Sequence, residues 1–298
     1  MAVNEYATIF SPILRELYGQ SLTSFDLYNS NTDLQIVNGK QIKVPKLSVS
    51  GYKDHTRGSL GMNTGTYDQS YELKTLDHDR DVEFVVDPMD VDETNMIVAI
   101  ANIQKRFETT QAIPEADAYT YSKIYAEYVR VGNTVKTTTL TAANVLTDFD
   151  ENLSKMEDAG VPIDRVILYC TTEYKKLLKN AEGITRTLAS GNSNLDRRVK
   201  TVDDIKKIVT VPSARFKTAY NFTNGWAAAP TAKQIDYILI DPEAQVSRDK
   251  YAFIKVYTPG HDSRTADNYL YQNRKYNGTF AIDELMANGC IIHTEATS

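Results

Sequence analysis

Acidic side chains are the most concentrated chemical groups in this 298-residue sequence. From residue 77 to residue 93 Arg80 is the only basic residue, and eight residues are acidic: Asp77, Asp79, Asp81, Glu83, Asp87, Asp90, Asp92 and Glu93. Carboxylate oxygens suit Ca²⁺ or Mg²⁺, but the segment lacks the glycine and closing glutamate of a calcium loop. In a strand, residues 77, 79 and 81 share one face while His78 points away. We therefore favour an acidic edge facing solvent or a partner over a metal site or local helix capping.

Hydrolytic chemistry needs a nucleophile, a base and an acid that converge from separate elements. The four histidines form no His-x-x-x-His pair, and the sequence has no Gly-x-Ser-x-Gly motif. The tetrapeptide Gly260-His261-Asp262-Ser263 holds all three residue types, but adjacent residues cannot easily form a triad, so we interpret it as a polar turn. Cys170 and Cys290 lie in apolar runs, which predicts buried free thiols of a reducing compartment rather than a nucleophile or a disulfide. We assign no catalytic residue.

Phosphate and nucleic-acid binding have little support in the sequence. The glycines between residues 51 and 65 lack the lysine and the strand-to-helix context of a phosphate loop. Nine basic residues lie between 173 and 207, among them Arg197 and Arg198, but no aromatic residue after Tyr174 offers a stacking platform there. We interpret this segment as a charged surface that could complement the acidic segment of a neighbour. We expect no cofactor and no metal.

The composition predicts a folded protein with a sizeable core, in one large or two medium domains. Hydrophobic residues make up 42% and charged residues 24% of the chain. The net charge of −6 arises within residues 77–93, because the remaining positions carry 32 basic and 31 acidic residues and are nearly neutral. We expect neither a membrane span nor a signal peptide. The 19 tyrosines, against 9 phenylalanines, favour surfaces where proteins meet proteins.

A β ribbon is the first element that must position these groups. Residues 41–50 and 71–76 alternate apolar and polar side chains, as strands do, and the glycine-rich residues 51–65 suit a loop tip. Each arm of about ten residues would extend roughly 33 Å. Because an isolated hairpin is marginally stable in water, the ribbon must lie on the body of the chain or on another subunit.

Helices are expected on both sides of this ribbon. Residues 6–28 predict a short, interrupted helical arm. Asp90-Val-Asp-Glu93 resembles a capping box and predicts a helix to Gln111, with apolar residues at 96, 100, 103 and 107. Pro114 is expected to end that helix and to begin a second one. The face of the second helix would hold Ala118, Tyr121, Tyr125 and Tyr128.

The region after Gly132 predicts mixed helices and strands. Thr141 could cap a helix that ends at Gly160, with a buried face of Val145, Phe149, Leu153 and Met156. Residues 172–178 predict a helix, residues 183–195 a loop, and Thr201-Val-Asp-Asp204 the start of another helix. Buried or paired strands are expected at residues 163–170, 234–241, 253–257, 269–276 and 290–294.

The order of these parts resembles the major capsid proteins of tailed bacteriophages, with the Johnson fold that encapsulin shells share. The resemblance covers nearly the whole chain and depends on order and lengths, not on a short diagnostic motif. It rests on the arm, the ribbon, residues 71–87 (YELKTLDHDRDVEFVVD), residues 90–94 before a long helix, residues 113–119 (IPEADAY) and the returning residues 269–280. It implies an α+β fold with an N-terminal arm (1–33), an extended β-hairpin loop (34–87), a peripheral domain with a spine helix (88–134 and 258–298) and an α/β axial domain (135–257).

The resemblance also implies a function. The chain would be a non-enzymatic shell protein of the virion that assembles with itself into pentamers and hexamers in the host bacterial cytoplasm. The icosahedral shell would enclose double-stranded DNA without sequence-specific contact and without a membrane. A separate scaffold, a portal and decoration proteins are the further partners that it suggests. The candidate contacts between subunits are Lys53, Arg57, Asp68, Glu72, Asp77, Asp79, Asp81, Arg197 and Arg198.

Three alternatives bear on this interpretation. An encapsulin-like compartment would use the same fold to store an enzyme. A cytosolic α/β hydrolase or metal-dependent enzyme would use His261 with Asp262, or the acids of residues 77–93. Some members of the resembling family crosslink a loop lysine to an asparagine of a neighbour, but no pattern selects Lys53, Lys74 or Asn288 for this, so we do not expect it.

Overall fold

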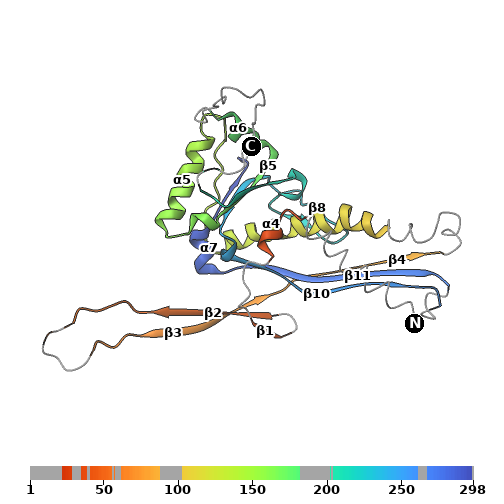
Figure 1. Ribbon diagram of the computed structural model, residues 1–298, viewed down its shortest axis with the longest axis horizontal. Helices are drawn as coiled ribbons and strands as arrows, with labels where there is room; N and C mark the ends of the chain where they lie inside the picture. The colour runs from red at the N-terminus through yellow and green to blue at the C-terminus, as the bar shows by residue number, and fades with distance from the viewer. Residues whose placement is uncertain are drawn as a thin grey trace, which may run out of the picture.

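The computed structural model describes residues 22–28, 35–38, 41–55, 57, 62–87, 103–181, 202, 204–260 and 267–296. These residues form an elongated molecule in which three parts are easily recognised (Figure 1). A β ribbon projects to one side, a long β-sheet with a helix along it extends to the other, and a smaller α/β layer stands above them. Among the described residues, no helix is both long enough and apolar enough to cross a membrane.

The ribbon consists of β2 (Gln41–Val49) and β3 (Tyr67–Thr75), with the short β1 (Gln35–Asn38) at its base. β2 and β3 are antiparallel and in continuous register, from the pair Gln41 and Thr75 to the pair Val49 and Tyr67. Each of these two strands has nine residues and is therefore about 30 Å long. The predicted two-armed ribbon is confirmed.

The described part of the acidic segment, residues 77–87, belongs to the body and not to the ribbon, whereas Asp90, Asp92 and Glu93 lie outside the described residues. β4 (His78–Val86) leaves the ribbon and pairs with β11 (Tyr269–Ala281), which pairs on its other side with β10 (Gln245–Tyr257). At the turn between the two sheets, Leu76 is buried in a cluster with Ile42, Val44, Val246 and Phe280. Beyond it, the inner face of β4 carries Phe84, whose ring packs edge-on against Phe107. Residues 78–86 and β10 thus belong to one three-stranded sheet, and the domain bounds expected at 34–87 and 135–257 stay a prediction.

Pro114 does not end a helix, contrary to the prediction. Residues 103–107 are helical, the π-helical turn η2 (Glu108–Ala112) follows, and α4 (Ile113–Arg130) continues directly from it. In this wider turn the N–H of Ile113 donates to the carbonyl of Glu108, five residues earlier. The backbone hydrogen bonds of the helix are therefore already shifted at the point where Pro114 has no N–H to donate. The expected start of this helix, at residues 90–100, lies outside the described residues.

The α/β layer is built on a four-stranded sheet in the order β12 (Cys290–Thr294), β9 (Ile235–Ile240), β5 (Ile167–Thr171), β6 (Lys207–Val211). Alternate residues of β5 face opposite sides: Tyr169 packs in the core with α4, while Leu168 packs with α5 (Val145–Asp158) and α6 (Thr172–Asn180). The predicted buried face of α5 and the predicted helix at α6 are confirmed. α7 (Asp283–Gly289) precedes β12, and the two-residue strands β7 (Tyr220–Asn221) and β8 (Ala227–Ala228) form a separate hairpin.

Two local predictions in this layer are wrong. No helix follows Asp204, because residues 204–206 are non-helical and the β-branched run Ile208-Val-Thr-Val211 forms most of β6, parallel to β5. The strand expected from residue 163 begins at Ile167, because η3 (Ile163–Arg165) is a 3₁₀ turn after Pro162. The short turns η1 (Phe25–Leu27), η4 (Ser213–Arg215) and η5 (Pro242–Ala244) complete the described elements.

Both cysteines are free and buried, as predicted. Burial raises the pKa of the Cys170 thiol to about 12, although nearby Lys175 opposes the shift, and burial also raises the pKa of Cys290. A thiol with a raised pKa carries little thiolate near neutral pH, so neither cysteine is suited to be a nucleophile.

Candidate assembly interface

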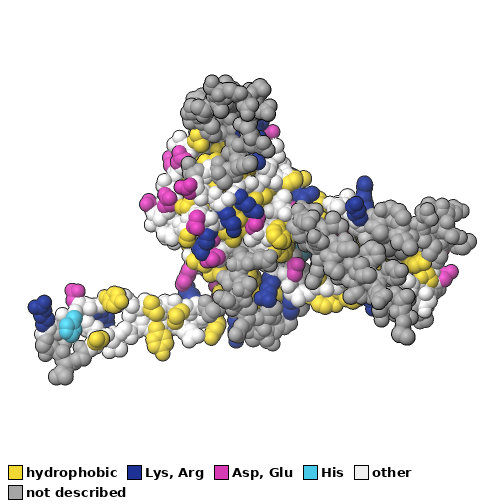
Figure 2. Space-filling model, viewed as in Figure 1, with side chains coloured by type: hydrophobic (Ala, Val, Ile, Leu, Met, Phe, Trp, Pro, Cys, Tyr) yellow, Lys and Arg dark blue, Asp and Glu magenta, His cyan; other side chains and the backbone are white. Residues whose placement is uncertain are grey.

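One face of the ribbon is apolar and exposed along its length. Strand register places Val49 opposite Tyr67, and Leu47, Tyr71 and Leu73 lie on the same face. The exposed fractions are 62% for Leu47, 72% for Val49 and 78% for Tyr67. Figure 2 shows hydrophobic side chains along this projecting part of the molecule. Patches of this kind mark protein–protein contacts when they are contiguous.

The opposite face of the ribbon is buried against the body at its base, and farther out Lys46 pairs with Glu284 of α7 at an exposed site. Ile42 and Val44 are buried at the base, in a cluster with Leu76, Val246 and Phe280. Farther along the same face, Lys46 and Ser48 are exposed. The base is therefore part of the core, whereas the distal half of the ribbon extends away from the described body (Figure 1).

The tip of the ribbon displays two large side chains. Tyr52 and Met62 are almost completely exposed. The loop around them is held by Asn63, whose Nδ2 donates to the carbonyls of Asp54, at 2.9 Å, and Lys53, at 3.3 Å. The tip thus has internal hydrogen bonds and presents its aromatic and thioether groups outward.

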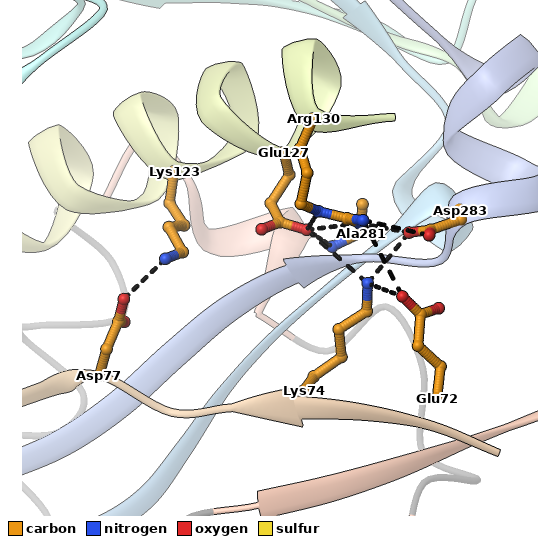
Figure 3. Close-up of polar contacts among 8 residues, drawn as sticks. All are labelled: Glu72, Lys74, Asp77, Lys123, Glu127, Arg130, Ala281 and Asp283. Carbon is orange, nitrogen blue, oxygen red and sulfur yellow. Dashed lines mark hydrogen bonds and ion pairs between the residues drawn. The ribbon is translucent and has the colours of Figure 1, made fainter. Parts of the chain in front are cut away.

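A group of charged residues fixes the ribbon to the body (Figure 3). Lys74 of β3 lies with its Nζ 2.7 Å from Glu72 Oε1, 3.0 Å from Asp283 Oδ1 of α7 and 4.0 Å from Glu127 Oε2 of α4. Only 8% of Lys74 is exposed. A buried ammonium needs such partners, because unpaired charge inside a protein is costly.

Arg130 completes this group, which we call the ionic anchor (Glu72, Lys74, Glu127, Arg130 and Asp283). Its Nη2 contacts Asp283 Oδ1, and lies 2.9 Å from Glu127 Oε2. Hydrogen bonds from Arg130, and then from Lys74, outweigh burial and hold the pKa of Asp283 well below its usual range. The ionic anchor therefore joins a ribbon strand to α4 and α7 through close ion pairs.

The acids of β4 and its turn differ in their surroundings. Asp77 accepts hydrogen bonds from Tyr119 Oη and Lys123 Nζ, both at 2.6 Å; these bonds lower its pKa although burial opposes them. Asp79 accepts from Arg274 at 2.6 and 3.0 Å. Asp81 and Glu83 are exposed on the same face as Asp79.

His78 points to the opposite face of β4, as the strand alternation predicted. It stacks on Tyr119 with ring centroids 4.0 Å apart, and burial, followed by the charge of Arg80, lowers its pKa to about 4. It is therefore neutral above pH 5. Among the described residues, no three histidine, cysteine or acidic side chains are grouped so as to hold a metal ion.

The predicted contact residues fall into three groups. Lys53, Arg57 and Asp68 are exposed on the ribbon, Glu72 is in the ionic anchor, and Asp77, Asp79 and Asp81 lie on the body. Arg197 and Arg198 lie outside the described residues. Whether these residues contact another subunit stays a prediction.

Sequence reasoning missed most of the ionic anchor and did not assign the apolar face of the ribbon. Lys74 and Asp283 are 209 positions apart, so no local pattern connects them. The alternation in β2 and β3 was visible in the sequence. On the face that turns toward the body, however, only Ile42 and Val44 at the base are apolar and buried. A count of apolar side chains on each face could have identified the exposed apolar face.

The enzymatic alternative finds little support in the described residues. His261 and Asp262 lie outside them. His293 has Asp236 Oδ2 2.9 Å from its Nδ1 and Thr138 Oγ1 3.1 Å from its Nε2, an order that resembles a hydrolase triad. Its side chain is, however, completely buried and stacked on Tyr237, so we interpret it as a link between β12, β9 and residues 136–138.

Comparison with known proteins gives matches of structure but not of sequence. No family model and no curated protein sequence matches the chain. A capsid chain of bacteriophage PhiM1 superposes with a TM-score of 0.63 at 14% identity, over 87% of this chain and 83% of that one. A capsid chain of cyanophage P-SCSP1u gives a TM-score of 0.62 at 15% identity, over 92% and 88%. A capsid chain of an empty GTA particle gives 0.54 at 9% identity, over 93% and 90%.

The likeness extends over most of each chain. At these identities it shows a shared fold. The α+β fold expected from the order of the sequence elements, and the resemblance to phage capsid proteins, are confirmed.

Proposed function

We propose that this chain is the major capsid protein of a tailed bacteriophage. It acts as a structural, non-enzymatic subunit of the virion. Copies of it form pentamers and hexamers, and these close into an icosahedral shell around double-stranded DNA. The observation that carries the proposal is an exposed apolar ribbon face on a fold shared with capsid chains.

The physical argument begins with the ribbon. A two-stranded hairpin is marginal in water, and this one keeps Leu47, Val49 and Tyr67 exposed beyond the point where the body supports it. A second copy can cover that face, and the ribbon of that copy then reaches a third. Such head-to-tail contacts close into rings when the rotation between copies allows it.

Many weak contacts are sufficient for such a shell. Each subunit shares several interfaces, so their effects combine even when a single contact is weak. Lys53, Arg57, Asp68, Glu72, Asp77, Asp79 and Asp81, together with Arg197 and Arg198, are the charged contacts that we propose. A separate scaffold, a portal and decoration proteins are proposed further partners. DNA is enclosed without sequence-specific contact, and tight binding of phosphate would hinder its packaging and release.

Domain boundaries follow the sheets in this proposal. The extended loop ends near Thr75, where β3 ends, and β4, β10 and β11 form the peripheral sheet along the spine helix. The axial domain then comprises the four-stranded sheet with α5 and α6. In this proposal β10 moves to the peripheral domain, and the axial domain comprises residues from about 135 to 244 together with β12 (Cys290–Thr294).

Electron microscopy and sedimentation of the purified full-length chain test this function. The chain is concentrated alone and after co-expression with a candidate scaffold protein. Closed particles or ring-shaped capsomers are expected. A chain that stays a discrete monomer under every assembly condition would contradict the proposal.

A further inference from the structure

Asparagine followed directly by glycine occurs four times in the sequence, at Asn38, Asn224, Asn277 and Asn288. Because glycine has no side chain, its backbone nitrogen is unhindered and can attack the amide carbon of the asparagine before it. The reaction converts the side-chain amide into a carboxylate. Each pair is therefore a potential site of covalent modification, and the sequence does not distinguish the four.

Two of these pairs are held by regular structure. Asn277 lies inside β11, is paired with both β10 and β4, and is only 5% exposed. Asn288 and Gly289 lie in α7, where Gly289 is buried. A side chain cannot fold onto the next backbone nitrogen while the hydrogen bonds of a strand or helix fix the dihedral angles between them. These two pairs are therefore protected in the folded chain. Gly39, which follows Asn38, lies outside the described residues.

Asn224 lies instead in the turn of a short hairpin beside α4 (Figure 1). Its strands β7 and β8 have two residues each, so few backbone hydrogen bonds hold the turn between them. Asn224 and Gly225 are both exposed. Gly225 has a φ of +72°, and a Cβ added to it would meet no atom within 4 Å. The turn therefore leaves room for the Asn224 side chain to fold onto the Gly225 nitrogen.

We propose that Asn224 is a site of spontaneous deamidation. The Gly225 nitrogen attacks Cγ of Asn224, the bond from Cγ to Nδ2 breaks, and ammonia leaves with the proton that the Gly225 nitrogen gives up. Water then opens the cyclic succinimide at one of its carbonyls and yields aspartate or isoaspartate. Water is the co-reactant, and no group is oxidised or reduced. This inference goes beyond the proposed function and does not depend on it.

The products would disturb the contact between the hairpin and the body. Arg80 of β4 donates hydrogen bonds to the carbonyls of Phe222 and Gly225, on either side of Asn224. Isoaspartate adds a methylene group to the backbone between these two carbonyls, so their spacing changes. Both products also add a carboxylate to the turn, which can compete for Arg80 with Glu115, whose Oε1 lies 2.6 Å from Arg80 Nε. Deamidation therefore weakens the hold of Arg80 on the hairpin.

Peptide mapping of aged protein tests the site. The full-length chain is incubated at mildly alkaline pH and digested with trypsin, which releases residues 218–233 with Asn224 and residues 276–298 with Asn277 and Asn288. Fragment masses locate the loss of each amide, and an isoaspartyl methyltransferase with a labelled methyl donor detects isoaspartate. In the folded chain Asn224 should lose its amide at least about tenfold faster than Asn277 or Asn288. An intact Asn224, or one that reacts no faster than these two, would overturn the inference.

Unfolding supplies the matched control. In guanidinium chloride the strand and helix no longer protect Asn277 and Asn288, so both should react within about threefold of the rate of Asn224. A difference that persists undiminished in the unfolded chain would show that the neighbouring sequence, and not the hairpin turn, selects Asn224. That result would overturn the structural basis of the inference and leave the proposed function standing.

The single tryptophan of the chain reports on the loss of the Arg80 contact. Trp226 lies in the hairpin, is half-buried, and has its ring centroid 6.3 Å from that of Tyr220. Ageing should shift the tryptophan emission of the parent chain but not that of Asn224→Gln, whose longer side chain does not readily form the succinimide. Asn288→Gln is the control and should age as the parent does. Equal emission of the aged parent chain and aged Asn224→Gln would overturn the proposed effect on Arg80.

Discussion

Lys74 connects the ribbon to the body through three carboxylates. Its ammonium is buried, and Glu72, Glu127 and Asp283 lie within 4.0 Å of it. With Arg130, the group holds two positive and three negative side chains. Removal of either cation would leave the three carboxylates close together with less compensating charge.

Replacing this lysine should destabilise the monomer. Lys74→Met keeps the length of the side chain and leaves the three carboxylates with Arg130 alone, so we expect a loss of about 2–4 kcal/mol in the free energy of unfolding. Urea denaturation monitored by circular dichroism measures it. The control is Lys46→Met, because Lys46 pairs with Glu284 at an exposed site and should cost at most about 1 kcal/mol. Equal effects of the two changes would refute the importance of the anchor.

Asp283 predicts how stability depends on pH. Its pKa is lowered in the folded chain by hydrogen bonds from Arg130 and Lys74. A carboxyl group with a lowered folded pKa contributes stability above its unfolded pKa, near 3.9, and this contribution is lost as the pH falls through the folded pKa. Thermal melting at pH 7 and pH 3 should therefore show a smaller pH-dependent loss for Asp283→Asn than for the parent chain. An unchanged difference would show that Asp283 is not the group concerned.

The residue scale is where sequence reasoning reached least far. Burial of Cys170 and Cys290 followed from their apolar neighbours, and the direction of His78, opposite to that of Asp77, Asp79 and Asp81, followed from strand alternation. The ionic anchor could not be inferred, because its members come from β3, α4 and α7. Only the packing of these elements brings their charges together.

At the scale of elements, periodicity predicted whatever has one buried face. The α5 face and the ribbon strands β2 and β3 are of this kind, whereas β5, β9 and β12 are buried on both faces and were visible as apolar runs. The prediction at Pro114 was wrong because the rule that proline ends a helix assumes regular α-helical hydrogen bonds, whereas the preceding turn η2 is π-helical. The helix expected after Thr201 was misjudged because pairing of the β-branched residues of β6 with β5 outweighs a local capping pattern.

The two faces of the ribbon should respond differently to substitution. Leu47→Ser on the apolar face should impair assembly strongly but change monomer stability by less than about 0.5 kcal/mol, because the side chain is exposed in the monomer. Ser48→Ala on the opposite face should leave both unchanged. Particle yield and urea denaturation, measured on the same preparations, distinguish the two effects. A large loss of monomer stability for Leu47→Ser would place this face against the body of its own chain.

Removing the distal ribbon tests the element as a unit. Deletion of residues 53–68 should leave the melting transition of the body unchanged, because the base residues Ile42, Val44 and Leu76 remain in their cluster. Particle formation should be lost. Unfolding of the deletion variant would show instead that the distal ribbon is needed for folding of the monomer.

At the scale of the whole molecule, the proposed ribbon contact would make each copy both a donor and an acceptor. A chain without residues 53–68 keeps the acceptor surface of its body but has no distal ribbon to offer. In a head-to-tail ring every member must do both. The deletion variant is therefore expected to enter rings and interrupt them, not merely to remain outside.

Mixing intact chain with the deletion variant makes this expectation quantitative. If one chain in five lacks the distal ribbon and a ring needs six intact members, only about a quarter of random rings are complete. Particle yield should then fall much more steeply than the fraction of intact chain, as light scattering and electron microscopy of mixed samples would measure. A variant unfolded by heat before mixing is the control, because it cannot occupy a position in a ring. A particle yield that falls only in proportion to the fraction of intact chain would mean that ribbon contacts do not join the copies into closed rings.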